Sequence, residues 1–180
     1  MLKLTDIQHF YFGITTQITT WLTPISQLFI RLVIAKVFLM SGLSKWNGFL
    51  KFDKNQYNLF MYEFFCPDPV RPHAVQLCDP KTLDYVDGSM MVSFIHSLAI
   101  SSGIMEVLFG TLLIIGLFSR LAALGLIGMT LFIQLAIFPS WEHWWNPAVW
   151  WFSALLVIFA VGPGKLSLDY FFKLERAPKA

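Results

Sequence analysis

Four long apolar runs constrain the fold of this chain more than any other feature. They lie at Ile25–Leu43, Met90–Phe118, Leu121–Phe138 and Pro147–Gly162. A helix needs about 20 mainly apolar residues to cross the hydrocarbon core of a bilayer. Of the 180 residues, 56% are hydrophobic and only 13% are charged, a balance typical of integral membrane proteins. The sequence therefore predicts an all-α integral membrane protein, folded as a four-transmembrane-helix bundle.

Charged residues interrupt two of these runs. Glu106 lies within the second run, and Arg31 and Lys36 lie within the first. An isolated charge at that depth costs roughly 2.5 kcal/mol or more, so each group needs a partner or water. We expect Glu106 to pair with Arg31 or Lys36, either to hold two helices in register or to carry chemistry. All three are candidate catalytic residues, because ionisable groups inside a membrane are often functional.

Two further polar residues are candidates for ligand binding. His96 lies in the second run and Gln134 in the third. We expect both to line one polar cavity with the three charged residues above. For His96 the simpler interpretation is an interfacial histidine bonded to backbone or water. Gly103 and Gly110 fall near Glu106 on one helical face, and small residues let helices approach closely in lipid.

Basic and aromatic residues indicate how the bundle is oriented. Four spans place both termini on one side, where Arg120 and the segment 165–179 put basic residues beside span ends. Such residues favour the cytoplasmic side. We therefore expect cytoplasmic termini, an extracytoplasmic loop 44–89 between helices 1 and 2, and insertion in the inner (cytoplasmic) membrane. Tryptophans, which favour the membrane interface, gather on the proposed outer side: Trp46, Trp141, Trp144, Trp145, Trp150 and Trp151.

The long loop carries the two cysteines of the chain. Cys66 and Cys78 flank a proline-rich stretch, and the proposed topology places them in an oxidising compartment. A structural disulfide is the favoured interpretation, worth about 3 kcal/mol by chain entropy. A redox pair that exchanges electrons with a quinone is the alternative, although the spacing is not Cys-x-x-Cys. A metal site with His73 lacks a second histidine, so no metal is expected. The preceding stretch, Asn47–Glu63, is expected to include a short helix that caps the bundle mouth.

Three stretches of the chain resemble proteins of the DoxX family. Arg31–Lys45 is similar to the first helix of that family, and Glu106 with the run through Gly116–Gly125 is similar to a later part. Gly162–Asp169 resembles the family's terminal motif. The resemblance implies a four-helix inner-membrane protein, and it adds Lys45 to the site residues.

The resemblance also divides the chain. It covers about residues 25–172 and departs from the family at 66–89, where the cysteine-bearing segment is longer. On this basis residues 1–24 form an N-terminal cytoplasmic or interfacial segment, and 173–180 form a C-terminal tail. For Thr5–Trp21, a helix on the membrane surface and a frayed tail are both open interpretations.

DoxX-like proteins are linked to a subunit of thiosulfate:quinone oxidoreductase and to membrane redox complexes. The resemblance thus implies an inner-membrane subunit that supports quinone-linked redox chemistry, with sulfur compounds as one substrate class. Its expected partners are the lipid bilayer and either an oxidoreductase or a second copy, and no nucleic acid. Quinone is the ligand to consider, and Lys45, His96 and Gln134 are the residues expected to bind it. The alternatives are a scaffold or assembly factor without chemistry, and a carrier of a small anionic sulfur species. Whether the chain is itself an enzyme stays open, because it has no cofactor motif.

Overall fold

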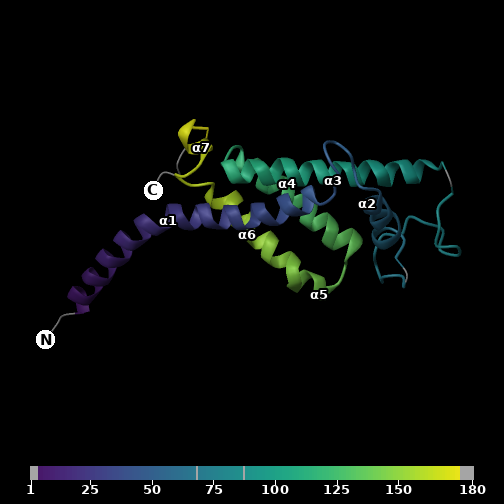
Figure 1. Ribbon diagram of the computed structural model, residues 1–180. Helices are drawn as coiled ribbons and strands as arrows, with labels where there is room; N and C mark the ends of the chain where they lie inside the picture. The colour runs from purple at the N-terminus through teal and green to yellow at the C-terminus, as the bar shows by residue number, and fades with distance from the viewer. Residues whose placement is uncertain (1–3, 68, 87, 175–180) are drawn as a thin grey trace.

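The computed structural model describes residues 4–67, 69–86 and 88–174, and this part of the chain is mainly helical (Figure 1). Four helical segments are long and apolar enough to cross a membrane: Tyr11–Leu43, Met90–Ile115, Ser119–Ile137 and Trp141–Val161. Each overlaps one of the four apolar runs of the sequence. The prediction of an all-α, four-span bundle is therefore confirmed.

The first helix, α1 (Leu4–Leu43), is longer than the predicted span. It contains Pro24, and its N-terminal part bends away from the bundle (Figure 1). Threonine hydroxyls along this part donate to the carbonyl four residues earlier, as Thr15 does to Tyr11 at 2.8 Å. The frayed-tail interpretation of Thr5–Trp21 is therefore wrong, because the segment is helical. Its contact with a membrane surface stays a prediction.

The second and third spans form a helical hairpin. Helix α3 (Met90–Ile115) ends at Gly116, whose φ of 72° gives the left-handed conformation that commonly closes a helix. Helix α4 (Ser119–Phe132) follows and continues into the π-helical turn η2 (Ile133–Ile137). The two helices diverge with distance from the Gly116 turn (Figure 1).

The fourth span begins earlier than the sequence indicates. A short helix α5 (Trp141–His143) and the π-helical turn η3 (Trp144–Ala148) precede α6 (Val149–Val161). Ser140 starts this unit, because its hydroxyl accepts a hydrogen bond from the His143 N–H. The predicted start at Pro147 is therefore a kink within the segment and not its beginning.

Two packed regions hold the bundle together. Helix α1 packs most extensively against α3, and α4 packs against α6. Between α1, α4 and α6 the buried core includes small residues such as Ala35, Ala122 and Ala123, which let the helices approach closely. The last helix, α7 (Leu168–Phe171), lies beside the hairpin turn (Figure 1).

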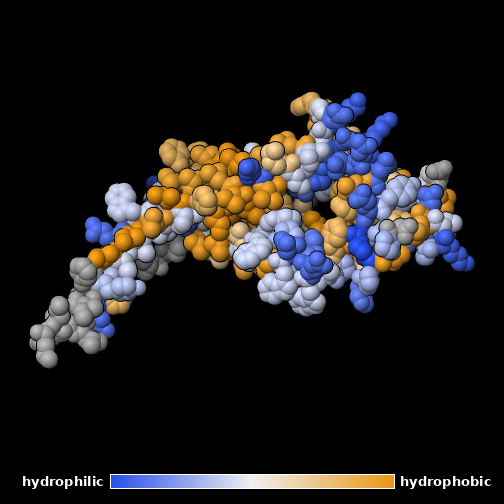
Figure 2. Space-filling view, turned by 60° about the horizontal axis from the view of Figure 1, so that its bottom comes forward, coloured by the Kyte–Doolittle hydropathy of each residue, from blue (hydrophilic) through white to orange (hydrophobic). Residues whose placement is uncertain are grey.

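The loop between the first two spans folds over one end of the bundle, as predicted. It contains α2 (Lys54–Asn58) and the π-helical turn η1 (Leu59–Phe64), which we call the cap. Aromatic side chains join the cap to α3 and η2, among them the buried Phe60 and Phe65. Hydrophilic side chains gather at this end, whereas apolar side chains cover the middle of the molecule (Figure 2).

The predicted disulfide is also confirmed. Cys66 and Cys78 are bonded, with their Cα atoms 5.5 Å apart, and both are buried. The bond uses both sulfurs, so the alternative metal site with His73 does not form. The loop that it closes is tied to the bundle by the Val75 N–H, which donates to the Ala136 carbonyl at 2.8 Å. The disulfide therefore braces a segment that contacts both the cap and the third span.

Candidate functional site

A buried ion pair joins the first two spans. Lys45 Nζ lies 2.5 Å from Glu106 Oε2, and the two residues are 8% and 5% exposed. The ammonium also donates to the hydroxyl of Ser41 at 3.1 Å. Lys45 follows the end of α1, and its backbone carbonyl accepts from the Asp53 N–H at 2.9 Å. The side chain therefore reaches back along the helix to a carboxylate that has no other basic partner among the described residues.

Glycines allow the two helices to come close enough for this pair. A Cβ on Gly42 would lie 2.9 Å from the Cβ of Glu106, and one on Gly103 would lie 3.4 Å from the Cδ of Lys45. A Cβ on Gly110 would meet the backbone of Leu39 at 3.1 Å. The expected close-packing face of α3 is thus observed, and α1 supplies the matching glycine.

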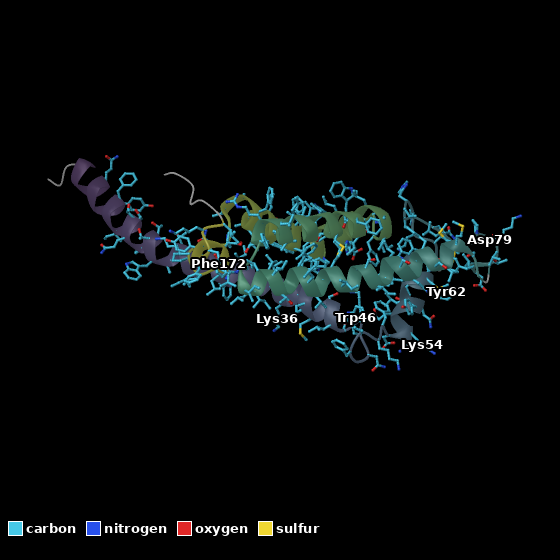
Figure 3. All side chains as sticks on the ribbon, turned by 90° about the horizontal axis from the view of Figure 1, so that it is seen from above. Lys36, Trp46, Lys54, Tyr62, Asp79 and Phe172 are labelled. Atoms are coloured by element: carbon cyan, nitrogen blue, oxygen red, sulfur yellow. A yellow bond between two sulfur atoms is a disulfide. The ribbon has the colours of Figure 1, made fainter. Side chains whose placement is uncertain are left out.

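The expected pairing of Glu106 with Arg31 or Lys36 is wrong. Lys36 is exposed and lies on the outside of the bundle (Figure 3). Arg31 is 1% exposed but belongs to the opposite end of the bundle, where it contacts the segment after α6. The sequence favoured basic residues inside the apolar run Ile25–Leu43 as partners of Glu106. The observed partner, Lys45, lies just beyond this run, and its side chain turns back into the bundle.

Arg31 takes part in a clamp that closes the other end of the bundle. Its guanidinium donates to the carbonyls of Pro163 at 2.8 Å and Leu166 at 2.7 Å. The nearby carboxylate of Asp169 balances its charge. That carboxylate also accepts from the N–H groups of Phe118 at 2.7 Å and Ser119 at 2.8 Å, at the start of α4. Asp169 therefore caps a helix distant in sequence, and both charges serve packing.

A cavity of about 610 Å³ lies at the Lys45–Glu106 end. Its walls come from α1, α3, α4 and α6, and the cap residues Leu59, Phe60 and Phe64 close it on one side. Most of the lining is apolar or aromatic, as in Phe38 and Trp151. The ion pair lies in this wall, so a buried charge faces an apolar space large enough for a flat ring.

A second polar group in the wall was not predicted from the sequence. His143 lines the cavity, and its Nδ1 lies 2.6 Å from Oε1 of Gln134. Gln134 was expected to line the cavity, but it is buried outside the lining and only contacts His143, which does line it. His143 follows the third loop of the chain, among tryptophans, and no spacing in the sequence links it to Gln134. The fold brings them together because η2 and α5 are joined by a short connection.

Other predicted members of a single polar cavity are placed elsewhere. His96 stacks on Tyr57, with ring centroids 4.3 Å apart, and is not part of the cavity lining. Arg31 lies at the opposite end, and Lys36 lies outside. Of the predicted residues, Lys45 and Glu106 therefore line the cavity, Gln134 contacts the lining residue His143, and the remaining three have separate surroundings.

Arg71, in the disulfide-closed loop, connects the cap to the cavity wall. It donates to the carbonyls of Glu63 and Phe64 at the end of η1. Its guanidinium carbon lies 4.4 Å from the ring centroid of Phe138, a cavity-lining residue. Burial lowers the pKa of Arg71 from its ordinary value, with the Glu63 carboxylate acting in the opposite direction, and the group stays charged.

These features define a class: a multi-pass membrane protein whose four-helix bundle forms a largely apolar cavity with a buried ion pair in its wall. A family model described as DoxX matches residues 26–139, and the chain belongs to the DoxX family. The matched region includes Lys45, Glu106 and Gln134, whereas His143 and Asp169 lie beyond it. No curated protein and no solved structure matches the chain.

Proposed function

We propose that this DoxX-family protein is an inner-membrane subunit that binds a quinone in the cavity and supports a partner oxidoreductase. The observation that carries the proposal is the buried Lys45–Glu106 pair in the wall of a largely apolar cavity of about 610 Å³. An ion pair that only joins two helices needs no adjoining cavity. A ligand that is apolar in its body and polar at its edge accounts for both features.

Quinone chemistry matches these groups. Reduction of a quinone adds two electrons and two protons, and negative charge develops on its oxygens. The ammonium of Lys45 would stabilise that charge, because a cation in a low-dielectric site acts strongly on a nearby anion. The carboxyl group of Glu106 would deliver or accept a proton, since it is already hydrogen-bonded to Lys45. The aromatic wall would hold the ring.

The electrons would come from the partner oxidoreductase, with a reduced sulfur compound as one donor class. The Cys66–Cys78 pair is the alternative internal donor. It would have to cycle between dithiol and disulfide as the quinone is reduced. The carrier alternative depended on Arg31 and Lys36 attracting an anion, and neither residue lines the cavity. Quinone binding is therefore the better-supported function.

The proposal also includes an orientation, with both termini in the cytoplasm. Arg120 and the basic segment 165–179 support it, because they flank span ends. When fused after Ala180, a reporter that is active only in the cytoplasm should be active, and one that is active only outside the cytoplasm should be inactive. Activity restricted to the other side would reverse the topology and place the disulfide in a reducing compartment.

The direct test is mass spectrometry of gently purified protein for copurified quinone and partner subunits. Lys45→Met should then weaken quinone binding about tenfold or more, because a hydrogen bond from a charged donor is lost. Lys36→Met is the matched control and should leave affinity unchanged, since Lys36 is exposed outside the bundle. Absence of any quinone binding by the wild-type protein would favour a scaffold.

A further inference from the structure

The second polar group of the cavity, His143, has a fixed tautomer. Its Nδ1 lies 2.6 Å from Gln134 Oε1, while Gln134 Nε2 donates to the Ser140 carbonyl at 3.0 Å. A carbonyl oxygen only accepts, so the amide nitrogen must face Ser140 and the amide oxygen must face the imidazole. Nδ1 therefore carries the hydrogen. In the neutral ring, Nε2 retains its lone pair.

The imidazole is also held in position by stacking. The rings of His143 and Phe138 have centroids 4.8 Å apart and an interplanar angle of 22°. Arg71 lies over the same phenyl ring and is anchored to the cap by two backbone carbonyls. Within the part of the chain that the structure describes, nothing bonds to Nε2 of His143. The imidazole of this lining residue is thus held in one orientation, with Nε2 unbonded.

The ion pair and His143 offer different groups to a ligand in the cavity. At one, Lys45 donates and Glu106 accepts, so either a carbonyl or a hydroxyl can be accommodated. At the other, the neutral His143 ring only accepts through Nε2. That nitrogen matches a hydroxyl and opposes a carbonyl oxygen, because two lone pairs would meet. Of the ion pair and His143, only His143 therefore discriminates between the oxidation states of a quinone.

We propose that His143 makes the cavity prefer the reduced, hydroxyl-bearing form of the quinone by accepting a hydrogen bond from it at Nε2. The inference rests on the proposed function, since it concerns the same ligand in the same cavity. It assigns His143 a specificity role in binding. One neutral hydrogen bond gained or lost corresponds to about a three- to tenfold difference in affinity.

The test uses the full chain in lipid nanodiscs, with a short-chain ubiquinone analogue and its quinol measured anaerobically. The wild-type protein should bind the quinol about three- to tenfold more tightly than the quinone. His143→Phe keeps an aromatic ring for stacking on Phe138 and should bring this ratio close to one. His96→Phe is the matched control, because His96 stacks on Tyr57 outside the cavity lining, and it should keep the wild-type ratio.

A second variant covers the case in which His143→Phe does not fold. Gln134→Met removes the acceptor that fixes Nδ1–H, so the ratio should fall toward one while the imidazole remains. Equal affinities of the wild-type protein for both forms, or an unchanged ratio in either variant, would overturn the role of His143 alone. Failure of the wild-type protein to bind either form would overturn the proposed function as well.

Discussion

The two ends of the bundle both bury charged side chains, and at one of them the charges adjoin a cavity of about 610 Å³. At the Arg31 end, two backbone carbonyls accept hydrogen bonds from the guanidinium, the nearby Asp169 carboxylate balances its charge, and Asp169 caps α4. At the other end, Lys45 and Glu106 pair in the wall of the cavity. A buried charge in a membrane span thus needs a second feature, an adjoining space, before it indicates chemistry.

The largest loss of stability is expected from the Arg31 end. Asp169→Ala leaves the N–H groups of Phe118 and Ser119 without their acceptor and Arg31 without a balancing charge. We expect the free energy of unfolding to fall by about 3–5 kcal/mol, as when one partner of a buried charge pair is removed. Denaturation in detergent measures it. Quinone affinity of the folded fraction should be unchanged; a selective loss of binding with normal stability would erase the distinction between the ends.

Loss of the disulfide should have the next largest effect, confined to the cap. Cys66→Ser should lower stability by about 3 kcal/mol, because the open loop gains chain entropy when unfolded. Release of Arg71 from Phe138 should also loosen the cavity wall and speed ligand dissociation. Stopped-flow release and thermal denaturation measure both effects.

The same variant separates the structural disulfide from the redox alternative. A structural bond should resist mild reductant, and residual turnover should survive the substitution. Abolished turnover in folded protein, with thiols that open and close as quinone is added, would assign electron transfer to Cys66 and Cys78. Free thiols after alkylation under non-reducing conditions would contradict the bond itself.

Glu106→Gln should lower stability less than Asp169→Ala or Cys66→Ser does, and it should lower turnover more. The amide oxygen keeps a hydrogen bond from Lys45 in a similar volume, but the ammonium loses its counter-charge, so we expect a stability loss of about 2–3 kcal/mol. Turnover with the partner should fall about 100-fold or more if the carboxyl group transfers protons. The loss of turnover is measured by steady-state kinetics and the loss of stability by folded yield, both on the same preparation. Equal proportional losses would make this end as structural as the Arg31 end.

The smallest effect is expected at alkaline pH, at a hydrogen bond between the loop and the cap. Tyr85 donates to the Met61 carbonyl at 2.8 Å, and burial raises the pKa of Tyr85 to about 12, with Tyr62 adding to the increase. The folded protein therefore holds this proton more tightly than the unfolded chain does. The resulting stability is complete below pH 10 and is lost as the pH rises toward 12. Between pH 10 and 12 the free energy of unfolding should therefore fall less in Tyr85→Phe than in the wild-type protein. Identical pH profiles of the two proteins would contradict this assignment.

The sequence was sufficient for the four spans, the cap and the disulfide, because each depends on local composition. Apolar length decides where helices cross, and cysteines beside a proline-rich turn lie close enough to bond. The partner of Glu106 was not predictable in this way. Lys45 lies outside the apolar run, and only the crossing of α1 and α3 at Gly42 and Gly103 brings its side chain inward.

The position of His143 and the role of Asp169 escaped prediction for a related reason. His143 meets Gln134 only because the chain reverses between η2 and α5. Asp169 was recognised as the end of a motif, but its two acceptor bonds reach an N-terminus on another helix. Contacts between elements depend on packing, which hydrophobic periodicity does not specify.

The central claim is that a quinone occupies the Lys45–Glu106 end and not the Arg31 end. Photolabelling with an azidoquinone, followed by peptide mass spectrometry, tests it most directly. We predict labelling of the peptides that carry Met105 on α3 and Met129 on α4, both of which line the cavity. Excess unlabelled quinone should suppress it. Competable labelling of the segment from Leu166 to Phe172, with the cavity peptides unlabelled, would contradict the account.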